Sequence, residues 1–340
     1  MNLLITGGAG FIGSNFIPFL LERYSNAHVV NLDKLTYAGN LDNLKEVENH
    51  PRYTFVQGDI CNSQLVQHLF EQYEFNGVIH FAAESHVDNS IKNPAAFVKT
   101  NVLGTFTLLE VARDYWMEGS NKYKTKFGNA RFHHISTDEV FGTLGHVEYF
   151  TETSQYAPNS PYSASKASSD MLVRSYFHTY GMNVVTTNCS NNYGPKQHEE
   201  KLIPTIIRKA IALEDIPIYG NGKNIRDWLY VTDHCRGIER VFYEGKPGEI
   251  YLIGGHNEKT NIEIAETICS ILDKVRPLHE NKKGITSYKQ LIKFVQDRPG
   301  HDFRYAINPK KIETELSWKP EFSFQNGIKE TVMWYLYSAK

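Results

Sequence analysis

A hydroxyl group and two carboxylates stand side by side in the segment HHISTDEVFG, residues 133–142. Thr137, Asp138 and Glu139 directly follow an alternating apolar stretch that predicts a buried strand over 131–137. Two adjacent carboxylates in a partly dry cleft repel each other as anions, so one is expected to hold a proton at neutral pH. Such a pair supplies one acid and one base. Taken alone, however, the three residues are better explained as a helix N-cap followed by acids in the first turn.

A tyrosine and a lysine, Tyr162 and Lys166, follow at a spacing of four residues in YSASK. On a helix these two side chains lie on one face, about one turn apart. The ammonium and a nicotinamide cation close by would favour the phenolate, so the tyrosine can act as a base near neutral pH. The lysine can also bond the nicotinamide ribose, and Thr137 can donate a hydrogen bond to the substrate oxygen being oxidised. The spacing by itself also fits an exposed helix face.

A glycine-rich segment, ITGGAGFIG, joins a predicted strand to a predicted helix. Its glycines follow the pattern G-x-x-G-x-x-G at Gly7, Gly10 and Gly13. Such a turn brings backbone N–H groups and a helix N-terminus to a pyrophosphate. Asp33 ends the next strand at the spacing expected for a carboxylate that bonds the adenosine ribose, which favours NAD over NADP. Lys34 weakens that preference slightly, and Asp59, after the third strand, is expected near the adenine.

Short β-branched stretches alternate with helical patterns through the first half of the chain, which indicates an α/β fold with a Rossmann-type doubly wound parallel sheet. The predicted strands are 2–6, 28–33, 53–59, 77–83, 131–137 and 183–189, and the predicted helices are 13–24, 63–73, 101–116 and 162–181. After about residue 190 the alternation stops, and helical patterns remain at 203–213, 260–272 and 308–316. We expect an NAD-binding domain over 1–190, to which about 226–255 returns, and a smaller mixed α/β C-terminal substrate lobe over 191–340.

The composition excludes several classes of protein. A net charge of −2 over 340 residues gives no footprint for nucleic acid or an anionic membrane. No apolar run approaches the roughly 20 residues of a membrane helix, and the N-terminus lacks the features of a signal peptide. The four cysteines form no CxxC pair, and three histidines, at positions 86, 133 and 134, show no metal-ligand spacing. We therefore expect a soluble, cytoplasmic protein without a metal.

The glycine pattern, the Thr137, Tyr162 and Lys166 set and the length resemble the extended short-chain dehydrogenase/reductases. Within that family the chain is similar to the dTDP-glucose 4,6-dehydratases, in the motifs STDEVFG, YSASKASSD, NCSNNYGP, EKLIP, NIRDWLYV and DRPGHD. The resemblance covers nearly the whole chain. It implies NAD as cofactor, dTDP-glucose as substrate, a homodimer with a four-helix interface and a place in deoxysugar synthesis, of rhamnose type.

The resemblance also implies a hydro-lyase mechanism with assigned roles. Oxidation of the sugar at C4 acidifies the C5 proton, water leaves across C5 and C6, and hydride returns to C6, giving dTDP-4-keto-6-deoxyglucose. Tyr162 is then the base for the C4 hydroxyl, Glu139 the base at C5 and Asp138 the acid for the C6 hydroxyl, with Thr137 and Lys166 completing the catalytic set.

Two sets of binding residues follow from the same resemblance. The cofactor set is Gly7, Gly10, Phe11, Ile12, Gly13, Asp33, Lys34, Leu35, Thr36, Asp59, Ile60, Phe81, Ala82, Ala83, Ser85, Thr100, Tyr162, Lys166 and Asn192. The substrate set is Ser85, Thr137, Asn191, Lys201, Leu202, Pro204, Pro217, Tyr219, Arg226, Asn261, Arg298 and His301. Arg226 and Arg298 have the guanidinium forks that match a pyrophosphate. Taken singly, Asn261 also fits a helix N-cap and Pro217 a turn.

One segment departs from the family pattern, and three alternatives remain. In KQHEEKLIP, His198 and Glu199 replace the usual Phe-Pro, which leaves the shape of this loop and the affinity for substrate open. A 4-epimerase has no leaving hydroxyl and does not need the Asp138–Glu139 pair. A GDP-mannose 4,6-dehydratase is expected to carry one acid there. A non-catalytic NAD-binding sensor needs only the glycines and Asp33.

Overall fold

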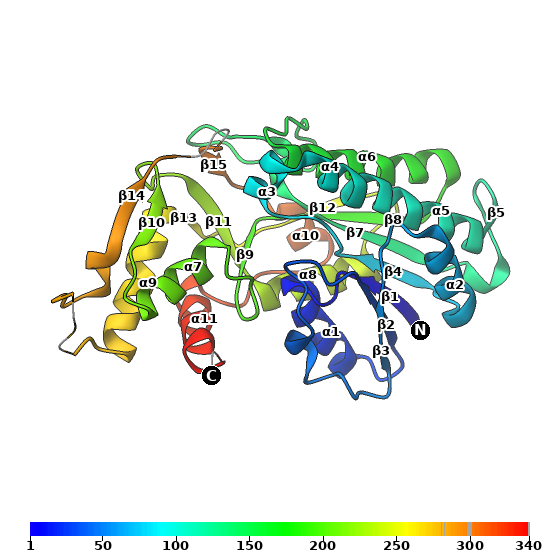
Figure 1. Cartoon of the computed structure of the whole chain (residues 1–340). Coiled ribbons are helices and arrows are strands. Elements are labelled where there is room, and N and C mark those ends of the chain that lie inside the picture. The colour runs from blue at the N-terminus through cyan, green and yellow to red at the C-terminus, as the bar shows by residue number, and fades with distance from the viewer. Residues whose placement is uncertain (280, 282, 298–300, 339–340) are drawn as a thin grey trace.

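The computed structural model describes residues 1–279, 281, 283–297 and 301–338, and a seven-stranded sheet forms its centre (Figure 1). All neighbouring strands pair in parallel, which confirms the predicted fold class. In spatial order the strands are β12 (Ile250–Ile253), β8 (Val184–Cys189), β7 (Arg131–Thr137), β4 (Gly77–His80), β1 (Asn2–Thr6), β2 (His28–Asp33) and β3 (Tyr53–Gln57).

The strand order reverses between β1 and β4. From β1 the chain builds outward through β2 to β3, and from β4 it builds the other way through β7 and β8 to β12. In an open parallel sheet, ligands bind outside the carboxyl ends of the strands at such a reversal. The carboxyl ends of β1, β2, β4, β7 and β8 therefore mark where a cofactor would lie.

Helices cover both faces of the sheet, which explains why most residues of its strands are buried. On one face α1 (Phe11–Arg23) packs with α8 (Val231–Glu244) in a core shared with β1 and β2. On the other face lie α2 (Ser63–Tyr73), α5 (Thr105–Trp116) and α6 (Pro161–Tyr180). Because α8 and β12 belong to these layers, the chain returns to the sheet after the second lobe has begun; the predicted domain boundary near residue 190 stays a prediction.

The predicted helix over 101–116 begins differently from the expectation. Regular α-helix starts at Thr105, and Val98–Gly104 form a π-helical segment after the short helix α4 (Pro94–Phe97). An extra residue in the turn of a π-helix re-aims side chains, and here Asn101 points inward. Its side chain accepts from the Glu84 backbone N–H at 2.8 Å and donates to the Ser165 hydroxyl at 2.8 Å.

One helical segment, residues 94–116, is long and apolar enough to cross a membrane by length and composition alone among the described residues. Asn101 and Thr105 are buried in it and hydrogen bonded to other parts of the chain, and Trp116 donates its indole N–H to the Phe75 carbonyl oxygen at 2.7 Å. These contacts tie the segment into the layer over the sheet, as expected for a core helix.

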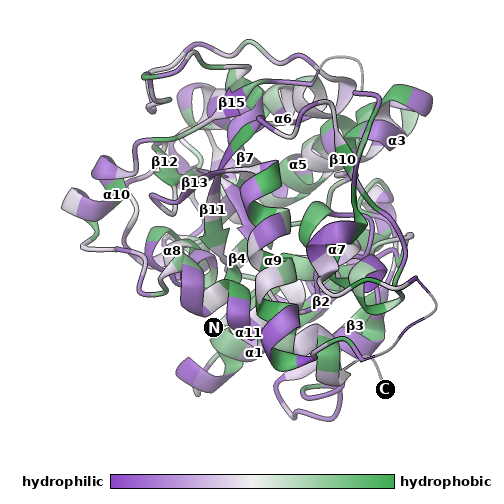
Figure 2. Cartoon of the chain, turned by 90° about the vertical axis from the view of Figure 1, so that its left-hand side faces the viewer, coloured by the Kyte–Doolittle hydropathy of each residue, from purple (hydrophilic) through white to green (hydrophobic). Residues whose placement is uncertain are grey.

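A second lobe lies beside the sheet domain, on the left in Figure 1. Its core joins α7 (Leu202–Ile211), α9 (Asn261–Val275) and α11 (Phe324–Ser338), which lie together and mix hydrophilic with hydrophobic residues (Figure 2). Its strands are β10 (Ile216–Tyr219) with β14 (Ile292–Val295), and β11 (Ile225–Tyr230) with β9 (Asn191–Tyr193), β13 (Glu258–Thr260) and β15 (Arg304–Tyr305). The shorter elements are α3 (Val87–Lys92), β5 (Met117–Gly119), β6 (Lys122–Tyr123), α10 (Lys310–Glu315) and the 3-10 turns Leu41–Leu44, Thr125–Phe127, Asp138–Phe141 and Tyr288–Leu291.

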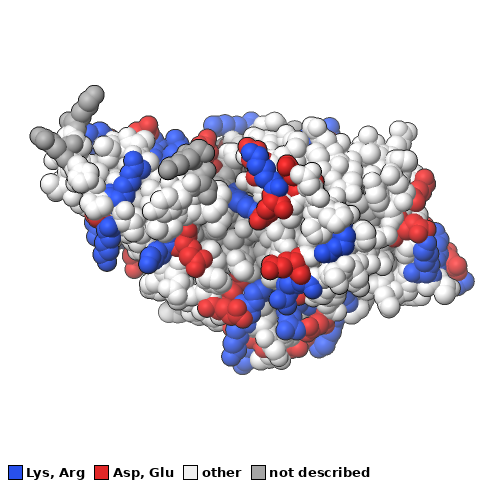
Figure 3. Space-filling view, turned by 90° about the horizontal axis from the view of Figure 1, so that it is seen from below, with Lys and Arg blue, Asp and Glu red and all other residues white. Residues whose placement is uncertain are grey.

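The surface carries charges of both signs. On the face shown in Figure 3, Lys and Arg are interspersed with Asp and Glu, without a large area of one sign. All four cysteines are free thiols, and three of them are buried. No group of three or more His, Cys, Asp or Glu side chains arranged to hold a metal ion occurs in the described part of the chain.

Candidate active site

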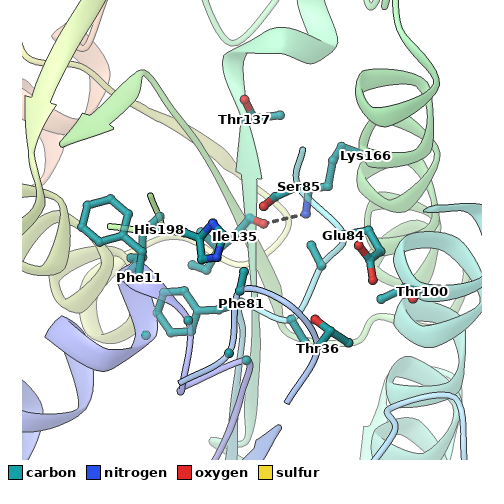
Figure 4. Close-up of a pocket in the computed structure, with 18 of the residues that line it drawn as sticks. Phe11, Thr36, Phe81, Glu84, Ser85, Thr100, Ile135, Thr137, Lys166 and His198 are labelled. Atoms are coloured by element: carbon teal, nitrogen blue, oxygen red, sulfur yellow. Dashed lines mark hydrogen bonds between the residues drawn. The ribbon is translucent and has the colours of Figure 1, made fainter. Parts of the chain in front are cut away.

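A pocket opens over the carboxyl ends of β1, β2, β4, β7 and β8, at the reversal of strand order. It brings together the glycine loop, the Thr137–Asp138–Glu139 segment, Tyr162 and Lys166. The loop from 197 to 201 closes it from the side of the second lobe. Figure 4 shows Phe11 and Phe81 on one side of the pocket and Lys166, Glu84 and Thr100 on the other.

The glycine loop is too tightly packed for side chains. Gly7 has a φ of +73°, and a Cβ there would lie 2.6 Å from the backbone of Ala82. A Cβ on Gly13 would lie 2.6 Å from Gly8 Cα and 2.7 Å from the Gly7 carbonyl oxygen. The loop therefore lies against the segment that follows β4 and against the start of α1, and leaves the helix N-terminus open to an anion. These features fit the pyrophosphate of a dinucleotide.

Asp33 is fixed at the end of β2 by backbone donors. Its Oδ2 accepts from the Ala9 N–H at 2.9 Å and its Oδ1 from the Leu35 N–H at 2.8 Å. Burial raises the pKa of its carboxyl, and the two N–H donors counteract that rise. Lys34, which was expected to weaken the preference for NAD, has its Nζ 2.9 Å from Asp59 Oδ2. Because this ion pair occupies the ammonium, Lys34 is less available to a 2′-phosphate.

The helix α6 positions the tyrosine and the lysine. It begins with a capping box between Ser160 and Ser163 and with Pro161 in its first turn, both strong helix-start signals. Tyr162 and Lys166 are both buried on the sheet side. Lys166 Nζ donates to the Ile135 carbonyl oxygen at 2.8 Å, as the dashed line in Figure 4 shows.

Burial shifts the acidities of both members of this pair. Burial raises the pKa of Tyr162 well above its usual value, as do the charges of Glu139 and Cys189, while a hydrogen bond with Thr137 lowers it. Burial lowers the pKa of Lys166 to about 8. In the chain alone, then, the tyrosine is a neutral phenol. The lysine and the buried surroundings do not by themselves produce the phenolate, so a second positive charge is needed beside the Lys166 ammonium, such as the nicotinamide cation that the sequence predicts.

The Thr137–Asp138–Glu139 segment is both a helix cap and part of the pocket, so the two interpretations of it from the sequence hold together. Thr137 is the N-cap of the 3-10 turn Asp138–Phe141, and its hydroxyl accepts from the Glu139 N–H at 3.3 Å. The same hydroxyl donates to Asp138 Oδ1 at 3.4 Å, and all three residues line the pocket. The cap thus aims two acids into the site.

The two carboxyl groups have different surroundings. Asp138 is only 1% exposed, and its Oδ2 has no hydrogen-bond partner among the described residues. Burial raises its pKa well above the usual value, with further increases from the charges of Glu139 and Asp227. Glu139 is less buried. Burial therefore favours the protonated form of Asp138, which is the form that can act as an acid.

Comparison with known proteins identifies the family. Residues 4–331 match the family described as GDP-mannose 4,6 dehydratase. The chain is 54% identical to the dTDP-glucose 4,6-dehydratase of Salmonella typhimurium over 345 residues, which cover 99% of this chain and 93% of that protein. It is 53% identical to the dTDP-glucose 4,6-dehydratase of Neisseria meningitidis over 335 residues, covering 98% and 93%. The chain belongs to the dTDP-glucose 4,6-dehydratase family.

Solved structures agree with this family. The Bacillus anthracis dTDP-glucose 4,6-dehydratase in complex with NAD has a TM-score of 0.85 and 45% identity, covering 99% of this chain and 96% of that chain. The Streptomyces venezuelae dTDP-glucose 4,6-dehydratase, also with NAD bound, has a TM-score of 0.87 and 44% identity, covering 99% and 97%. A UDP-glucose 4-epimerase of Thermotoga maritima shares the fold at a TM-score of 0.85, with full coverage of both chains, but at only 26% identity.

Most residues predicted from the dehydratase family lie in the pocket. All of the predicted cofactor-binding residues line it except Leu35, whose side chain packs against the core under β2. Of the substrate set, Ser85, Thr137, Asn191 and Lys201 line it. The others lie elsewhere, and Arg298 is outside the described residues.

The remaining substrate residues are in the second lobe. Leu202 and Pro204 begin α7, and Pro217 lies in the strand β10, not in a turn. The Tyr219 ring stands edge-on to His301. Asn261 is the first residue of α9, whose N-cap is Thr260. Arg226 is 5% exposed; its guanidinium lies over the Tyr305 ring and donates to the Asp302 carbonyl oxygen at 2.9 Å. Their roles in dehydratase substrate binding stay predictions.

Several pocket residues were missed from the sequence. Some of them lie at the ends of strands, so the rule that carboxyl strand ends form the site would have found them: Leu32 in β2, Ile135 and Ser136 in β7, Cys189 at the end of β8 and Ser190 directly after it. Others reach the pocket from loops, where no periodic signal exists: Ala38, Gly39, Gly58, Glu84, Gln197, His198 and Glu200 also line it. Where the family usually has Phe-Pro, His198 stands edge-on to the Tyr37 ring with centroids 5.7 Å apart.

Proposed function

We propose that this chain converts dTDP-glucose to dTDP-4-keto-6-deoxyglucose with NAD as its cofactor. The observation that carries the proposal is the meeting, in one pocket, of a dinucleotide loop, the Tyr162–Lys166 pair and the adjacent acids Asp138 and Glu139. A simple dehydrogenase uses the first two features, whereas elimination of water needs the acids as well.

The residues that would hold NAD are those of the glycine loop, Asp33 and Lys166. The loop offers N–H groups to the pyrophosphate, Asp33 offers a carboxylate to the adenosine ribose, and Lys166 offers an ammonium to the nicotinamide ribose. When bound, NAD supplies reversible two-electron oxidation at the sugar carbons. The ion pair of Lys34 with Asp59 supports NAD over NADP.

Tyr162 and Thr137 handle the proton of the C4 hydroxyl. Tyr162 Oη takes this proton, and the Thr137 hydroxyl holds the sugar oxygen through a hydrogen bond. Burial of both residues excludes water and strengthens these interactions. Because burial alone raises the pKa of Tyr162, the Lys166 ammonium must stay protonated for the phenolate to form.

Asp138 and Glu139 carry out the elimination. A ketone at C4 acidifies the C5 proton, which the Glu139 carboxylate accepts. Asp138, protonated because it is buried, gives its proton to the departing C6 oxygen, so that water leaves. Glu139 then returns a proton to C5. In a 4-epimerase no oxygen leaves the sugar, so neither acid would have a role in the reaction.

Mass spectrometry of the product formed from dTDP-glucose in heavy water tests this function. We expect loss of one water and retention of one solvent deuterium at C5. Unchanged mass with inversion at C4 would instead show an epimerase. Conversion of GDP-mannose in preference to dTDP-glucose would show that the chain is a GDP-mannose 4,6-dehydratase. Bound NAD without turnover of any nucleotide sugar would favour a non-catalytic NAD-binding sensor.

We also propose that two copies pair through the helices α5 and α6. Large apolar side chains are exposed on this side of the molecule although they would be better buried: Ile91, Val98, Leu103, Phe106 and Met171. A two-fold contact would bring these helices together as four. Light scattering should give a dimer for the native chain and a monomer for Phe106→Glu; a native monomer would refute the pairing.

We propose a cytoplasmic location because the four thiols are unpaired and disulfides are rare in reducing compartments. Fractionation of the source cells should place the chain with cytosolic enzymes, and recovery in the membrane fraction would contradict this.

A further inference from the structure

A third polar residue continues the face of α6 that carries the catalytic pair. Asp170 follows Lys166 by four residues, as Lys166 follows Tyr162, so all three side chains point toward the sheet. Asp170 is 2% exposed. None of the proposed chemical steps uses it, yet burying a carboxylate is costly unless it is paired.

The hydrogen bonds of Asp170 connect it to residues of the candidate active site. Its Oδ2 accepts from Asn188 Nδ2 at 3.0 Å and from the Tyr156 hydroxyl at 3.1 Å. The same Asn188 amide donates to the Thr137 carbonyl oxygen at 2.9 Å. Asp170 Oδ1 lies 3.1 Å from His134 Nε2, in a bent geometry that leaves this oxygen without an aligned donor in the described chain.

His134 stands between Asp170 and Lys166. Its Nε2 is 3.1 Å from the carboxylate and 3.5 Å from Lys166 Nζ, while its Nδ1 is buried without a hydrogen-bond partner among the described residues. One ring nitrogen cannot both donate to Asp170 and accept from Lys166. The shorter contact and the negative charge favour an Nε2 proton directed at Asp170. Lys166 is then left to donate to the Ile135 carbonyl oxygen.

We infer that Asp170, acting through His134, is a positioning residue that keeps Lys166 protonated and bound to the Ile135 carbonyl oxygen. The expected effect on turnover rests on the proposed function, whereas the expected hydrogen bonding of His134 and Lys166 does not. Asp170 is not among the residues that line the pocket, so its effect reaches the reaction only through Lys166.

The electrostatics of the buried cluster support this assignment. Burial lowers the pKa of Lys166 to about 8, and the negative charge of Asp170 is the largest influence that raises it. Burial lowers the pKa of His134 to about 4, so the ring is neutral at neutral pH. The other titratable or charged groups that face this cluster are His80 on β4, Cys189 on β8, Tyr156 before α6, Arg174 and Tyr162 on α6, and Asp138 after β7.

The tautomer of His134 gives a direct test. In Asp170→Asn the amide oxygen must take the place of Oδ2, where Asn188 and Tyr156 both donate. The amide NH₂ then faces His134 Nε2, which has to become an acceptor. Nitrogen NMR of ring-labelled histidines should show the proton of His134 on Nε2 in the native protein and on Nδ1 in the variant. A proton on Nδ1 in the native protein overturns the inference without any variant.

The pH dependence of turnover gives the catalytic test. Removing the negative charge should weaken proton binding to Lys166, whose pKa is about 8 in the native chain, by about tenfold. The variant, saturated with NAD and dTDP-glucose, should then lose about threefold in kcat at pH 7.5 but only about a tenth at pH 6, with KM unchanged. A loss that is the same at both pH values would mean that Asp170 is merely structural, and would overturn the inference.

Asp233→Asn is the matched control. Asp233 is equally buried on a helix of the sheet domain and accepts from the Glu321 and Phe322 N–H groups, both at 2.9 Å, far from Lys166 in the hydrogen-bond network. It should lower the melting temperature without changing the pH profile or the His134 tautomer. If the native protein has no dehydratase activity, the proposed function fails, while the tautomer of His134 still decides this inference.

Discussion

Replacing Gly13 with alanine tests how the glycine loop binds a dinucleotide. The new Cβ would lie 2.6 Å from Gly8 Cα and 2.7 Å from the Gly7 carbonyl oxygen. Both neighbours are backbone atoms, so no side chain can rotate away. To reach ordinary van der Waals contact the loop must retreat from α1 by about 0.8 Å.

The size of the effect follows from two opposing terms. Alanine favours a helix by about 1 kcal/mol over glycine, and Gly13 lies within α1. Overpacking costs about 1–3 kcal/mol, so the free energy of unfolding should fall by about 0–2 kcal/mol. Binding also weakens, because a shift approaching 1 Å moves the N–H groups that would face the pyrophosphate. We expect the Kd for NAD to rise at least about tenfold, or about 1.4 kcal/mol.

Calorimetric titration of the NAD-free protein with NAD measures this Kd, and a thermal melt measures stability. Gly119→Ala is the matched control, because a Cβ at Gly119, in β5, meets nothing within 4 Å. It should leave both values unchanged. A Gly13→Ala variant that binds NAD as tightly as the native chain would refute the reasoning that this loop is the pyrophosphate site.

Three further changes probe charge and stability. Asp138 has a raised pKa in the folded chain, so its contribution to stability is full below pH ~4 and is lost as the pH rises. Asp138→Asn should therefore have a higher melting temperature than the native chain at pH 8 but not at pH 4, and it should lose dehydratase activity. An equal rise in melting temperature at both pH values would contradict this reasoning. Lys34→Ala breaks a half-exposed ion pair and should change urea stability by less than about 1 kcal/mol; a larger loss would mean the pair is structural. Arg52 donates to three backbone carbonyl oxygens at and just after the end of α1. Arg52→Ala should therefore lower the free energy of unfolding, measured in urea, by about 2–3 kcal/mol. An unchanged free energy of unfolding would show that water replaces the guanidinium.

The sheet was predictable because its strands are mostly buried and therefore read as short β-branched stretches with few charges. The strands 2–6, 28–33 and 131–137 match β1, β2 and β7. The predicted strand 77–83 ends at His80, because residues 81–83 turn aside to line the pocket. The π-helical turn before Thr105 was not predictable, because the hydrogen bonds that Asn101 makes from it go to Glu84 and Ser165, which are distant in sequence.

The site was predictable where its residues follow strands. Asp33 and Thr137 stand at strand ends, and topology alone brings such ends together. Residues that come from loops, such as Glu84 and His198, reach the pocket only through tertiary packing, which no local pattern records. The Asp170–His134 contact is of this kind, since the two residues lie on a helix and a strand that meet only in the folded chain.

Burial acts on three ionisable groups of this site in the same sense, toward their neutral forms. It raises the pKa of Asp138 and of Tyr162, and it lowers the pKa of Lys166. The first shift serves the reaction, since Asp138 has to arrive with a proton. The other two oppose it, since Tyr162 has to lose a proton and Lys166 has to keep one. The burial that keeps Asp138 protonated therefore also hinders deprotonation of Tyr162, unless a fixed negative charge keeps Lys166 protonated. Asp170 is the carboxylate placed to do so.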